Sequence, residues 1–390
     1  MKILMIAPEP CFQPRGTPFS VYHRITALLR LGHTVDLVTY HLGDDADLEG
    51  LRMFRIGRVP GVHKVKVGPS GIKFVLDILV FLRAVGLLLT RRYDVIHTHE
   101  EAGLMGAILS RLARTLHLYD MHSDLAQQLL NFDFTRNRFL LRLMGAVQRL
   151  IIQQSDAVIV ICPDLVRRVQ EIAPDKPCVL IENTSMLDSY HEATPAEVAA
   201  LRQELGIDGR RVFLYTGTME SYQGMDLLVE SLPAVVARHP DVVVLAVGGQ
   251  PEQIAALRAL AERLGVGEHL VCPGVRPPEE MWAFMQLADV LVSPRLLGTN
   301  TPLKLYSYLR AGRPILATNL LTHTQVLDDE TALLVEPRPE AWAAGALRLL
   351  EEAGLAARLA ANGLRLAEQK YTYEAYLEKT ALAYTRLAQG

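Results

Sequence analysis

The sequence predicts an α/β protein with two doubly wound domains that face each other across a cleft. Two observations lead to this prediction. Short, continuous apolar runs alternate with amphipathic helical segments, which is typical of βα repeats. The alternation then starts again after a polar, turn-rich stretch near the middle of the chain. The length of 390 residues, half of them hydrophobic, suits two domains with separate cores.

The first half contains apolar runs without the alternation of a half-exposed strand. Such runs indicate strands that are covered on both faces, as in a parallel sheet of the Rossmann-like type. A helical pattern over 20–31 ends at Gly32, which is suited to a helix C-cap. The predicted strands of this half are 2–7, 34–40, 94–97, 117–119, 157–161 and 178–181.

The second half begins after the polar segment 182–194. Thr194, Pro195 and Glu197 have the spacing of a capping box, and the helix that they open should end at Gly206. We expect an acceptor-binding domain over 1–186, a donor-binding domain over 187–371, and a terminal helix within 372–390 that packs back onto the first. The predicted strands of this half are 211–216, 241–247, 269–272, 290–293, 314–317 and 332–335.

Composition excludes several classes of protein. Lys and Arg number 40 and Asp and Glu 43, a formal charge of −3, which argues against an extended nucleic-acid surface. The four cysteines are far apart and form no CxxC pair, which argues against a disulfide framework or a structural zinc site. No uncharged stretch reaches the roughly 18 residues of a membrane span. We expect a cytoplasmic protein that can touch the inner face of a membrane without crossing it.

The loop after the first predicted strand carries the first candidate site. Pro14, Arg15, Gly16 and Thr17 lead directly into a helix. A glycine there lets backbone amides approach a ligand, and a helix N-terminus favours an anion. The chain has neither a GxGxxG nor a GxxxxGK[ST] motif, so an ordinary dinucleotide site or P-loop is not expected. A tight turn without function remains the alternative reading.

Two more strand ends of the first half are rich in polar residues. His97, His99 and Glu100 suggest a metal site, but we expect the two histidines to point to opposite sides of the strand and hence no metal. After the next strand, His122 lies between Asp120 and Ser123. Without a GxSxG elbow, a hydrolase triad is not favoured. We interpret His122 as a hydrogen-bond donor at the mouth of the cleft; a structural histidine is the alternative.

The strand ends of the second half form a further set of candidate loops. Glycines follow three of the predicted strands, and a segment of small polar residues with one lysine opens a later helix. Backbone amides at Thr301 and Leu303, together with Lys304, suit a diphosphate. The candidate donor-binding residues are Gly217, Thr218, Gln223, Gly248, Gly274, Val275, Arg276, Thr299, Asn300, Thr301, Pro302, Leu303, Lys304 and Ser307.

The order of these motifs resembles the family-4 retaining glycosyltransferases of GT-B fold over nearly the whole chain. The segment 29–35 is similar to the family's "L…GHeV", and 94–99 is similar to "DviHaH". The segments 215–228 and 288–294 resemble "y.G…KGid.ll" and "aDv.v.PS". The segment 304–318 resembles "K..eYlA.GkPvvaT".

The resemblance implies a role for each candidate. Gly16, Thr17 and His122 would face the sugar and the acceptor. The segment 274–276 would lie near the nucleotide base, and 299–307 would hold the ribose, phosphates and sugar. The resemblance also implies a nucleoside-diphosphate sugar as co-substrate, no metal or other cofactor, and transfer with retention to a glycan, lipid-linked or small-molecule acceptor.

The sequence departs from the family pattern at the donor site. Family members usually carry two glutamates eight residues apart, where this chain has Thr299 and Ser307. The lysine of "KGid" is replaced by Gln223, and we hypothesise that Lys304 supplies the missing positive charge. Two hypotheses follow: a working transferase, or a non-catalytic GT-B binding or scaffold subunit with a degenerate donor site. A nucleotide-sugar epimerase is disfavoured, because no pair of acid/base carboxylates is apparent.

Two segments of the first half raise the question of membrane contact. The segment 72–92 is apolar nearly all round a helix, broken by Lys73, Asp77 and Arg83, and 136–153 mixes arginines with large apolar residues. Lys64, Lys66, Arg91 and Arg92 flank the first segment. Such helices either are buried in the protein or lie at a membrane interface. Both readings stay open at this point.

Overall fold

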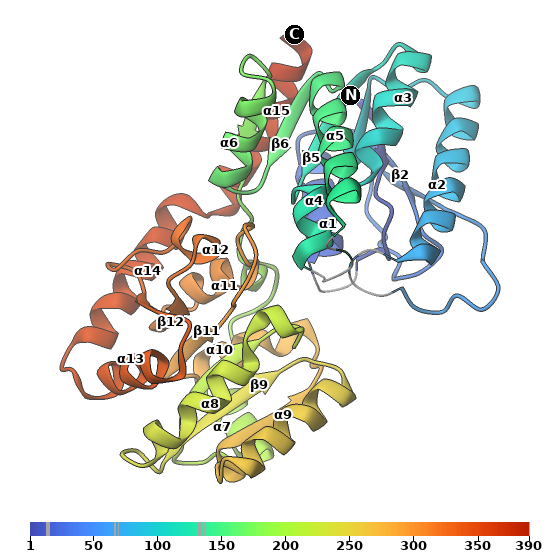
Figure 1. Cartoon of the computed structure of the whole chain (residues 1–390). Helices are drawn as coiled ribbons and strands as arrows, with labels where there is room; N and C mark the ends of the chain where they lie inside the picture. Colours follow the sequence, from blue (N-terminus) through green and yellow to red (C-terminus); the bar gives the residue numbers. More distant parts are fainter. Residues whose placement is uncertain (13–15, 66–67, 69, 132–134, 136, 390) are drawn as a thin grey trace. The chain divides into compact units, whose positions relative to one another are not determined.

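The computed structural model describes residues 1–12, 16–65, 68, 70–131, 135 and 137–389 (Figure 1). Pro14, Arg15, Lys66 and Arg136, which the sequence analysis singled out, lie outside these residues. The chain divides into two compact units. The first unit comprises residues 1–183 together with 374–390, and the second unit comprises 184–373.

The first unit is built on a seven-stranded sheet in which all neighbouring strands are parallel. The strand order reverses between β1 and β4, because the chain winds first to one side and then to the other. In spatial order the strands are β3 (Leu51–Arg55), β2 (Thr34–Thr39), β1 (Lys2–Ile6), β4 (Val95–His99), β5 (Leu116–Met121), β6 (Ala157–Val160) and β7 (Cys178–Leu180).

Helices connect these strands, and the last helix of the chain also packs on this unit. Arg24 Nη1 donates to Thr380 Oγ1 over 3.0 Å, and Arg386 Nη1 donates to the Cys178 carbonyl over 3.2 Å. The helices are α1 (Gly16–Arg30), α2 (Gly71–Thr90), α3 (Ala102–Ala113), α4 (Leu125–Asn131), α5 (Arg138–Gln154), α6 (Pro163–Ile172) and α15 (Tyr373–Gln389).

The second unit has a six-stranded parallel sheet whose order reverses between β8 and β11. The strands are β10 (Leu270–Gly274), β9 (Val242–Val247), β8 (Arg211–Thr216), β11 (Val290–Ser293), β12 (Ile315–Thr318) and β13 (Leu333–Val335). Its helices are α7 (Pro195–Leu205), α8 (Met225–Val236), α9 (Pro251–Arg263), α10 (Met281–Leu287), α11 (Lys304–Arg310), α12 (Leu321–Thr324), α13 (Pro339–Glu351) and α14 (Leu355–Lys370).

Each sheet is buried on both faces, as its continuous apolar strands require. Along β9, Val244 and Ala246 belong to one core, while Val243 and Leu245 belong to the core on the opposite face. The two parallel Rossmann-like sheets confirm the predicted fold class.

Local signals in the sequence account for most element boundaries. Thr194 and Glu197 form the predicted capping box at the start of α7, and Gly206 ends that helix with a φ of 65°. The Asn137 side chain accepts from two amides in the first turn of α5. Two predictions were wrong: α1 begins at Gly16 rather than at residue 20, and strand β3 was not predicted at all. Strand β3 lies at the edge of the sheet, where burial on both faces does not shape its sequence.

Candidate functional site

The first group of candidate residues lies at the carboxyl ends of β4 and β5. In doubly wound sheets, ligands bind beyond the carboxyl ends of the strands near the point where the strand order reverses, here between β1 and β4. His97 and His99 belong to β4, Asp120 belongs to β5, and His122 follows it directly. All four side chains are buried.

Asp120 is the charged centre of this group. Arg24 Nε on α1 lies 2.9 Å from Asp120 Oδ2, and both side chains are almost completely inaccessible to solvent. Burial alone would raise the pKa of Asp120, but Arg24 and His122 outweigh it and hold that pKa well below its usual range. The carboxylate therefore stays ionised, and its buried charge is compensated by the guanidinium.

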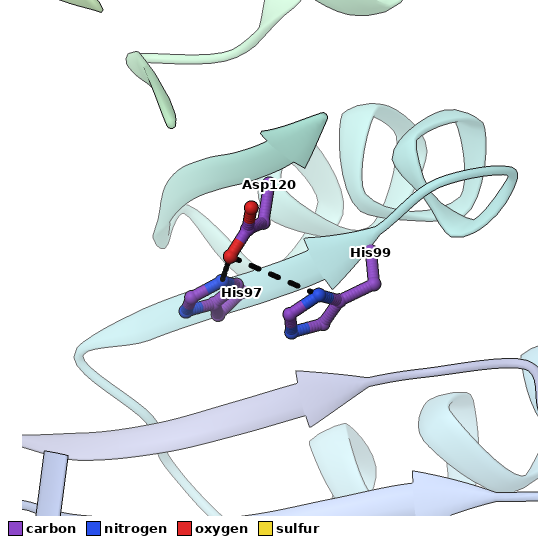
Figure 2. A group of neighbouring side chains, drawn as sticks. All are labelled: His97, His99 and Asp120. Atoms are coloured by element: carbon purple, nitrogen blue, oxygen red, sulfur yellow. Dashed lines mark hydrogen bonds and ion pairs between the residues drawn. The ribbon is translucent and has the colours of Figure 1, made fainter. Parts of the chain in front are cut away.

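The prediction that His97 and His99 point to opposite sides was wrong. Residues two apart on a strand share a face, and the two imidazoles stack with centroids 4.8 Å apart and planes 12° from parallel (Figure 2). With Asp120 they place possible metal-ligand atoms within 4.8 Å of one another. Arg24 already donates to Asp120 Oδ2, so a metal ion on that oxygen would lie next to a buried guanidinium of like charge.

His122 is the predicted catalytic residue, and its environment favours the protonated form. Its Nε2 lies 3.2 Å from Asp120 Oδ1 and 3.2 Å from His99 Nδ1. Burial lowers the pKa of His122, but the charge and hydrogen bond of Asp120 outweigh burial and raise it. Burial lowers the pKa of both His97 and His99. Among these three histidines, His122 is therefore the one prepared to carry a proton.

Glu100 is a site residue whose importance the sequence analysis missed. It directly follows β4 with a φ of 49°, a left-handed conformation that is rare outside glycine. Its carboxylate is buried and accepts a hydrogen bond from Ser123 Oγ at 3.1 Å. Burial raises the pKa of Glu100 to about 8, with His122 opposing the shift. Backbone strain and a shifted carboxyl beside His122 are typical of functional sites.

The predicted residues Gly16 and Thr17 form the start of α1. Gly16 has a φ of 43°, and a Cβ there would meet no atom within 4 Å. In the part of the chain that the structure describes, no hydrogen bond joins either residue to His122. The structure thus places them on the helix that carries Arg24 and leaves their role a prediction.

In the second unit, three predicted glycines lie together at the carboxyl ends of β8, β9 and β10. Gly217 N donates to the Val247 carbonyl over 3.0 Å, and Gly248 N donates to the Gly274 carbonyl over 2.7 Å. A Cβ at Gly248 would lie 2.1 Å from the Gly217 carbonyl oxygen, so only glycine fits there. The strand ends can therefore approach one another closely, and their backbone is accessible to a ligand.

Lys304 lies beside this group of glycines. Its ammonium is buried and has no hydrogen-bond partner among the described residues, although the residue as a whole is partly exposed. The nitrogen lies 3.6 Å from the centroid of the Tyr215 ring, and a Cβ on Gly217 would lie 3.3 Å from it. Burial, with a smaller contribution from Arg295, holds the pKa of Lys304 well below its usual range.

Two further predicted residues of this region also hold unpartnered polar atoms. Within the described ranges, Gln223 Oε1 and Thr301 Oγ1 are buried without a hydrogen-bond partner. Buried polar atoms are normally paired, so these atoms suggest that a ligand completes the site.

The other predicted residues of the second unit are held within its loops. The Asn300 side chain accepts from Arg295, and the Thr299 carbonyl accepts from Gln325. Ser307 Oγ lies 3.5 Å from Ser185 Oγ. The Thr218 carbonyl accepts from the Tyr215 hydroxyl. The carbonyls of Pro302 and Leu303 accept the first amide hydrogen bonds of α11.

The predicted base-binding turn presents mainly backbone. The Arg276 guanidinium forms ion pairs with Glu204 and Glu280, both at 2.7 Å. Val275 is largely exposed. The backbone of 274–276 and the Val275 side chain are thus the groups available to a base there.

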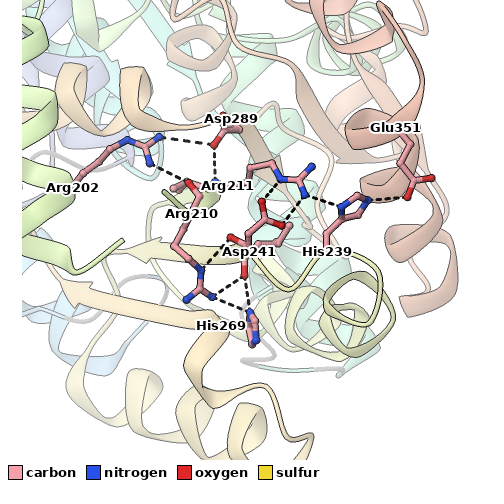
Figure 3. A network of polar contacts seen from close by, with 10 residues as sticks. Arg202, Arg210, Arg211, His239, Asp241, His269, Asp289 and Glu351 are labelled. Atoms are coloured by element: carbon pink, nitrogen blue, oxygen red, sulfur yellow. Dashed lines mark hydrogen bonds and ion pairs between the residues drawn. The ribbon is translucent and has the colours of Figure 1, made fainter. Parts of the chain in front are cut away.

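Other cations of the second unit are paired in a network at the amino ends of the strands, opposite the candidate donor loops (Figure 3). Arg211 begins β8 and pairs with Asp241 at 2.6 Å, and His239 lies 2.8 Å from Glu351. Arg210 donates to the Asp241 carbonyl over 3.1 Å. This network ties the amino ends of the strands together. It is a structural feature, in contrast to the unpaired Lys304 at the carboxyl ends.

Comparison with protein families gives matches in both units. A family described as "Glycosyl transferase 4-like domain" matches residues 15–184, and "Glycosyl transferases group 1" matches residues 210–352. Together the two matches span most of the chain.

Individual proteins with similar sequence or structure match over nearly their full lengths. The chain is 23% identical to an uncharacterized glycosyltransferase of Methanocaldococcus jannaschii, covering 98% of each chain. Its fold is similar to sucrose-phosphate synthase of Thermosynechococcus elongatus (TM-score 0.81, 20% identity, 100% and 99% covered). It is also similar to Anabaena HepE in complex with UDP-glucose (TM-score 0.75, 16% identity, 99% of each chain).

Proposed function

The chain belongs to the GT-B glycosyltransferases of group 1, the GT4-like family, and from this premise we propose that the candidate groups of each unit are functional. By family it is a retaining glycosyltransferase that takes a sugar from a nucleotide sugar. We assign donor binding to the carboxyl ends of β8–β11 in the second unit. The group around His122 in the first unit serves the sugar and the acceptor.

The unpaired ammonium of Lys304 is the observation that carries the donor assignment. It is buried beside Gly217 at the point where the strand order of the second sheet reverses. A buried cation is strongly disfavoured unless a counter-charge accompanies it. A diphosphate supplies that charge, and the lack of side chains at Gly217 and Gly248 lets it approach the strand ends closely. Lys304 would then stabilise the leaving diphosphate as the glycosidic bond breaks.

In the first unit, we assign hydrogen bonding to the sugar and to the reacting groups to His122. A protonated imidazole held by Asp120 donates a hydrogen bond to a sugar hydroxyl or to charge that develops during transfer. Arg24 holds the Asp120 carboxylate of that pair in place. No step of this proposal requires a metal.

A non-catalytic binding subunit is the second candidate function. Thr299 and Ser307 stand where the family usually has glutamates; the Thr299 carbonyl accepts from Gln325, and Ser307 Oγ lies 3.5 Å from Ser185 Oγ. A hydroxyl at position 307 still binds a ribose hydroxyl, but more weakly than a carboxylate does. The intact Asp120–His122 pair favours the transferase, because a scaffold has no need of a buried histidine that is held against an ionised carboxylate.

We further propose a lipid-linked acceptor, with membrane contact through α2, α3 and α5. Lys73 pairs with Glu101, Asp77 accepts from Tyr40, and Arg83 lies over the Phe54 ring, so all three charges of α2 are engaged within the protein. The outward face of α2 is therefore apolar, and α3 packs against both α2 and α5. Large apolar residues with 43–82% exposure are Phe74, Val75, Ile78, Leu82, Leu89, Ile108, Leu112, Phe139, Leu143 and Leu150.

On α5, Arg138, Arg142 and Arg149 are exposed, and their positive charges suit anionic lipid. Within the described ranges, no helix combines the length and the apolar composition of a bilayer-spanning segment. The proposed contact is accordingly peripheral.

The donor assignment is tested by thermal shift and calorimetry with UDP, GDP, ADP, dTDP and their common sugars, UDP-glucose included. We expect the chain to bind the diphosphate of one base more tightly than the others. At 100 times its dissociation constant, that ligand should stabilise the fold by about 2.7 kcal/mol. Binding should take up protons, because the diphosphate raises the pKa of Lys304 towards its usual value.

The Lys304→Met variant is the decisive comparison. This variant should bind the diphosphate that wild type prefers roughly 10- to 100-fold more weakly than wild type does, and without the uptake of protons on binding. Arg348→Met, at an exposed pair with Glu352, is the control and should bind as wild type does. Wild-type protein that binds none of the four diphosphates would support the non-catalytic subunit instead.

A further inference from the structure

A second buried cation, Arg295, lies in the loop that follows β11. Its side chain is 7% exposed. Nε donates to the Leu297 carbonyl over 2.7 Å, and Nη2 donates to Asn300 Oδ1 over 2.9 Å. Both acceptors are neutral, so these contacts fix the guanidinium in place without compensating its charge.

The loop is shaped around this guanidinium. Gly298 has a φ of 116°, and a Cβ there would lie 2.3 Å from Arg295 Nη2. Glycine at 298 is therefore required both by the backbone conformation and by the space that the guanidinium occupies. The described contacts use Nε and Nη2 and leave Nη1 without a partner among the described residues.

No carboxylate pairs with Arg295 or with Lys304 among the described residues, whereas the buried Arg24 pairs with Asp120. The charge of Arg295 contributes to the lowered pKa of Lys304, so the two cations lie within electrostatic reach of each other. Two like charges buried near each other without a counter-charge are unfavourable, and a bound anion removes that penalty.

The surroundings of Arg295 connect it to the predicted donor loop. Its guanidinium carbon lies 5.2 Å from the centroid of the Tyr222 ring, and Leu296 N donates to the Tyr222 carbonyl over 2.8 Å. Gln223, with its unpartnered Oε1, is the next residue. Strands β8 and β11 are neighbours at the reversal of strand order, so their loops share one end of the sheet.

We propose that Arg295 and Lys304 together bind the diphosphate of the donor, with Arg295 providing from the β11 loop the cation that position 223 lacks. The inference rests on the proposed function and assigns a further specificity-determining residue to the same site. Arg295 would favour nucleoside diphosphates over nucleosides, since a guanidinium bonds phosphate oxygens with directed N–H groups.

The test compares each nucleoside diphosphate of the panel with its own nucleoside by calorimetry on the full chain. The ratio of the two affinities isolates the contribution of the phosphates. In Arg295→Gln this ratio should fall roughly 10- to 100-fold, while nucleoside affinity stays as in wild type. Arg210→Gln, in the network at the amino ends of the strands, is the matched control and should leave the ratio unchanged.

Two additional variants separate charge from loop structure. Arg295→Lys keeps the charge but loses the paired contacts to Leu297 and Asn300, and it should retain most of the ratio. Gln223→Lys placed in the Arg295→Gln background should restore part of it. If Arg295→Gln unfolds, the Arg295→Lys variant provides the test instead. A ratio of diphosphate affinity to nucleoside affinity as low as that of Lys304→Met would overturn the role of the Arg295 charge.

The outcomes distinguish the inference from the function on which it rests. A wild-type protein that binds no diphosphate more tightly than its nucleoside would overturn both. A wild-type preference that persists unchanged in Arg295→Gln would overturn the assignment of Arg295 alone and leave the donor site to Lys304.

Discussion

Glu100 shows how a single residue connects stability to the site. Its carboxyl has a pKa of about 8 in the folded protein against 4.5 in a free chain, because it is buried. Between these values the folded state holds a proton that the unfolded state has released. Stability contributed by the protonated carboxyl is therefore present below pH 4.5 and is lost as the pH rises to about 8.

We predict that Glu100→Gln makes stability less dependent on pH. The variant should gain stability over wild type as the pH rises from 5 to 8.5, by at most about 5 kcal/mol, since one pKa unit corresponds to about 1.4 kcal/mol. Urea denaturation of both proteins at several pH values measures the difference. A difference that stays constant across this range would show that Glu100 is ionised in the fold.

Residue chemistry was only partly predictable from the sequence. His122 was identified because it follows a predicted strand, and Lys304 because it opens a helix after small polar residues. In the fold, His122 lies beside a buried carboxylate, and the Lys304 ammonium is buried without a hydrogen-bond partner among the described residues. Arg24 and Arg295 were missed, because one lies within a helix and the other in a loop without a recognised pattern. Their importance depends on partners distant in sequence, or on the absence of partners, and only the folded chain reveals either.

At the scale of elements, continuous apolar runs were the reliable signal. They located twelve of the thirteen strands, whereas β3, in which none of the five residues is fully buried, gave no such run. Of the two readings of α2, burial in the protein holds for one face of the helix, and membrane contact stays a prediction. Leu76, Val80, Ala84 and Leu87 form a buried face, while the opposite face is exposed.

The exposed face of α2 leads to a prediction about membranes. The full chain should sediment with vesicles that contain anionic phosphatidylglycerol, and less so as salt screens the attraction. Leu82, which is 57% exposed at the centre of that face, should be critical: Leu82→Glu should lower partitioning about tenfold or more. Leu264→Glu, at a 38% exposed leucine after α9 in the second unit, is the control. Equal sedimentation of both variants, or none by wild type at low salt, would argue against docking through α2.

At the scale of the whole molecule, the two units hold different chemical groups, which predicts separable defects. His122 lies in the first unit and Lys304 in the second. His122→Gln retains a hydrogen-bond donor towards Asp120 but loses the protonatable imidazole. We expect this variant to bind the nucleoside diphosphate within about twofold of wild type, while release of sugar from the donor slows roughly 100-fold or more.

The pH dependence of turnover gives this prediction a second readout. Because the charge and hydrogen bond of Asp120 raise the pKa of His122 despite burial, the imidazole keeps its proton to a higher pH than in an unfolded chain. Wild-type turnover should therefore fall as the pH rises through that pKa, and the fall should be absent in His122→Gln. Lys304→Met should show the reverse pattern, with weakened diphosphate binding and a retained His122-dependent pH profile at saturating donor. If His122→Gln weakens nucleotide binding as strongly as Lys304→Met does, the division of roles between the units is wrong.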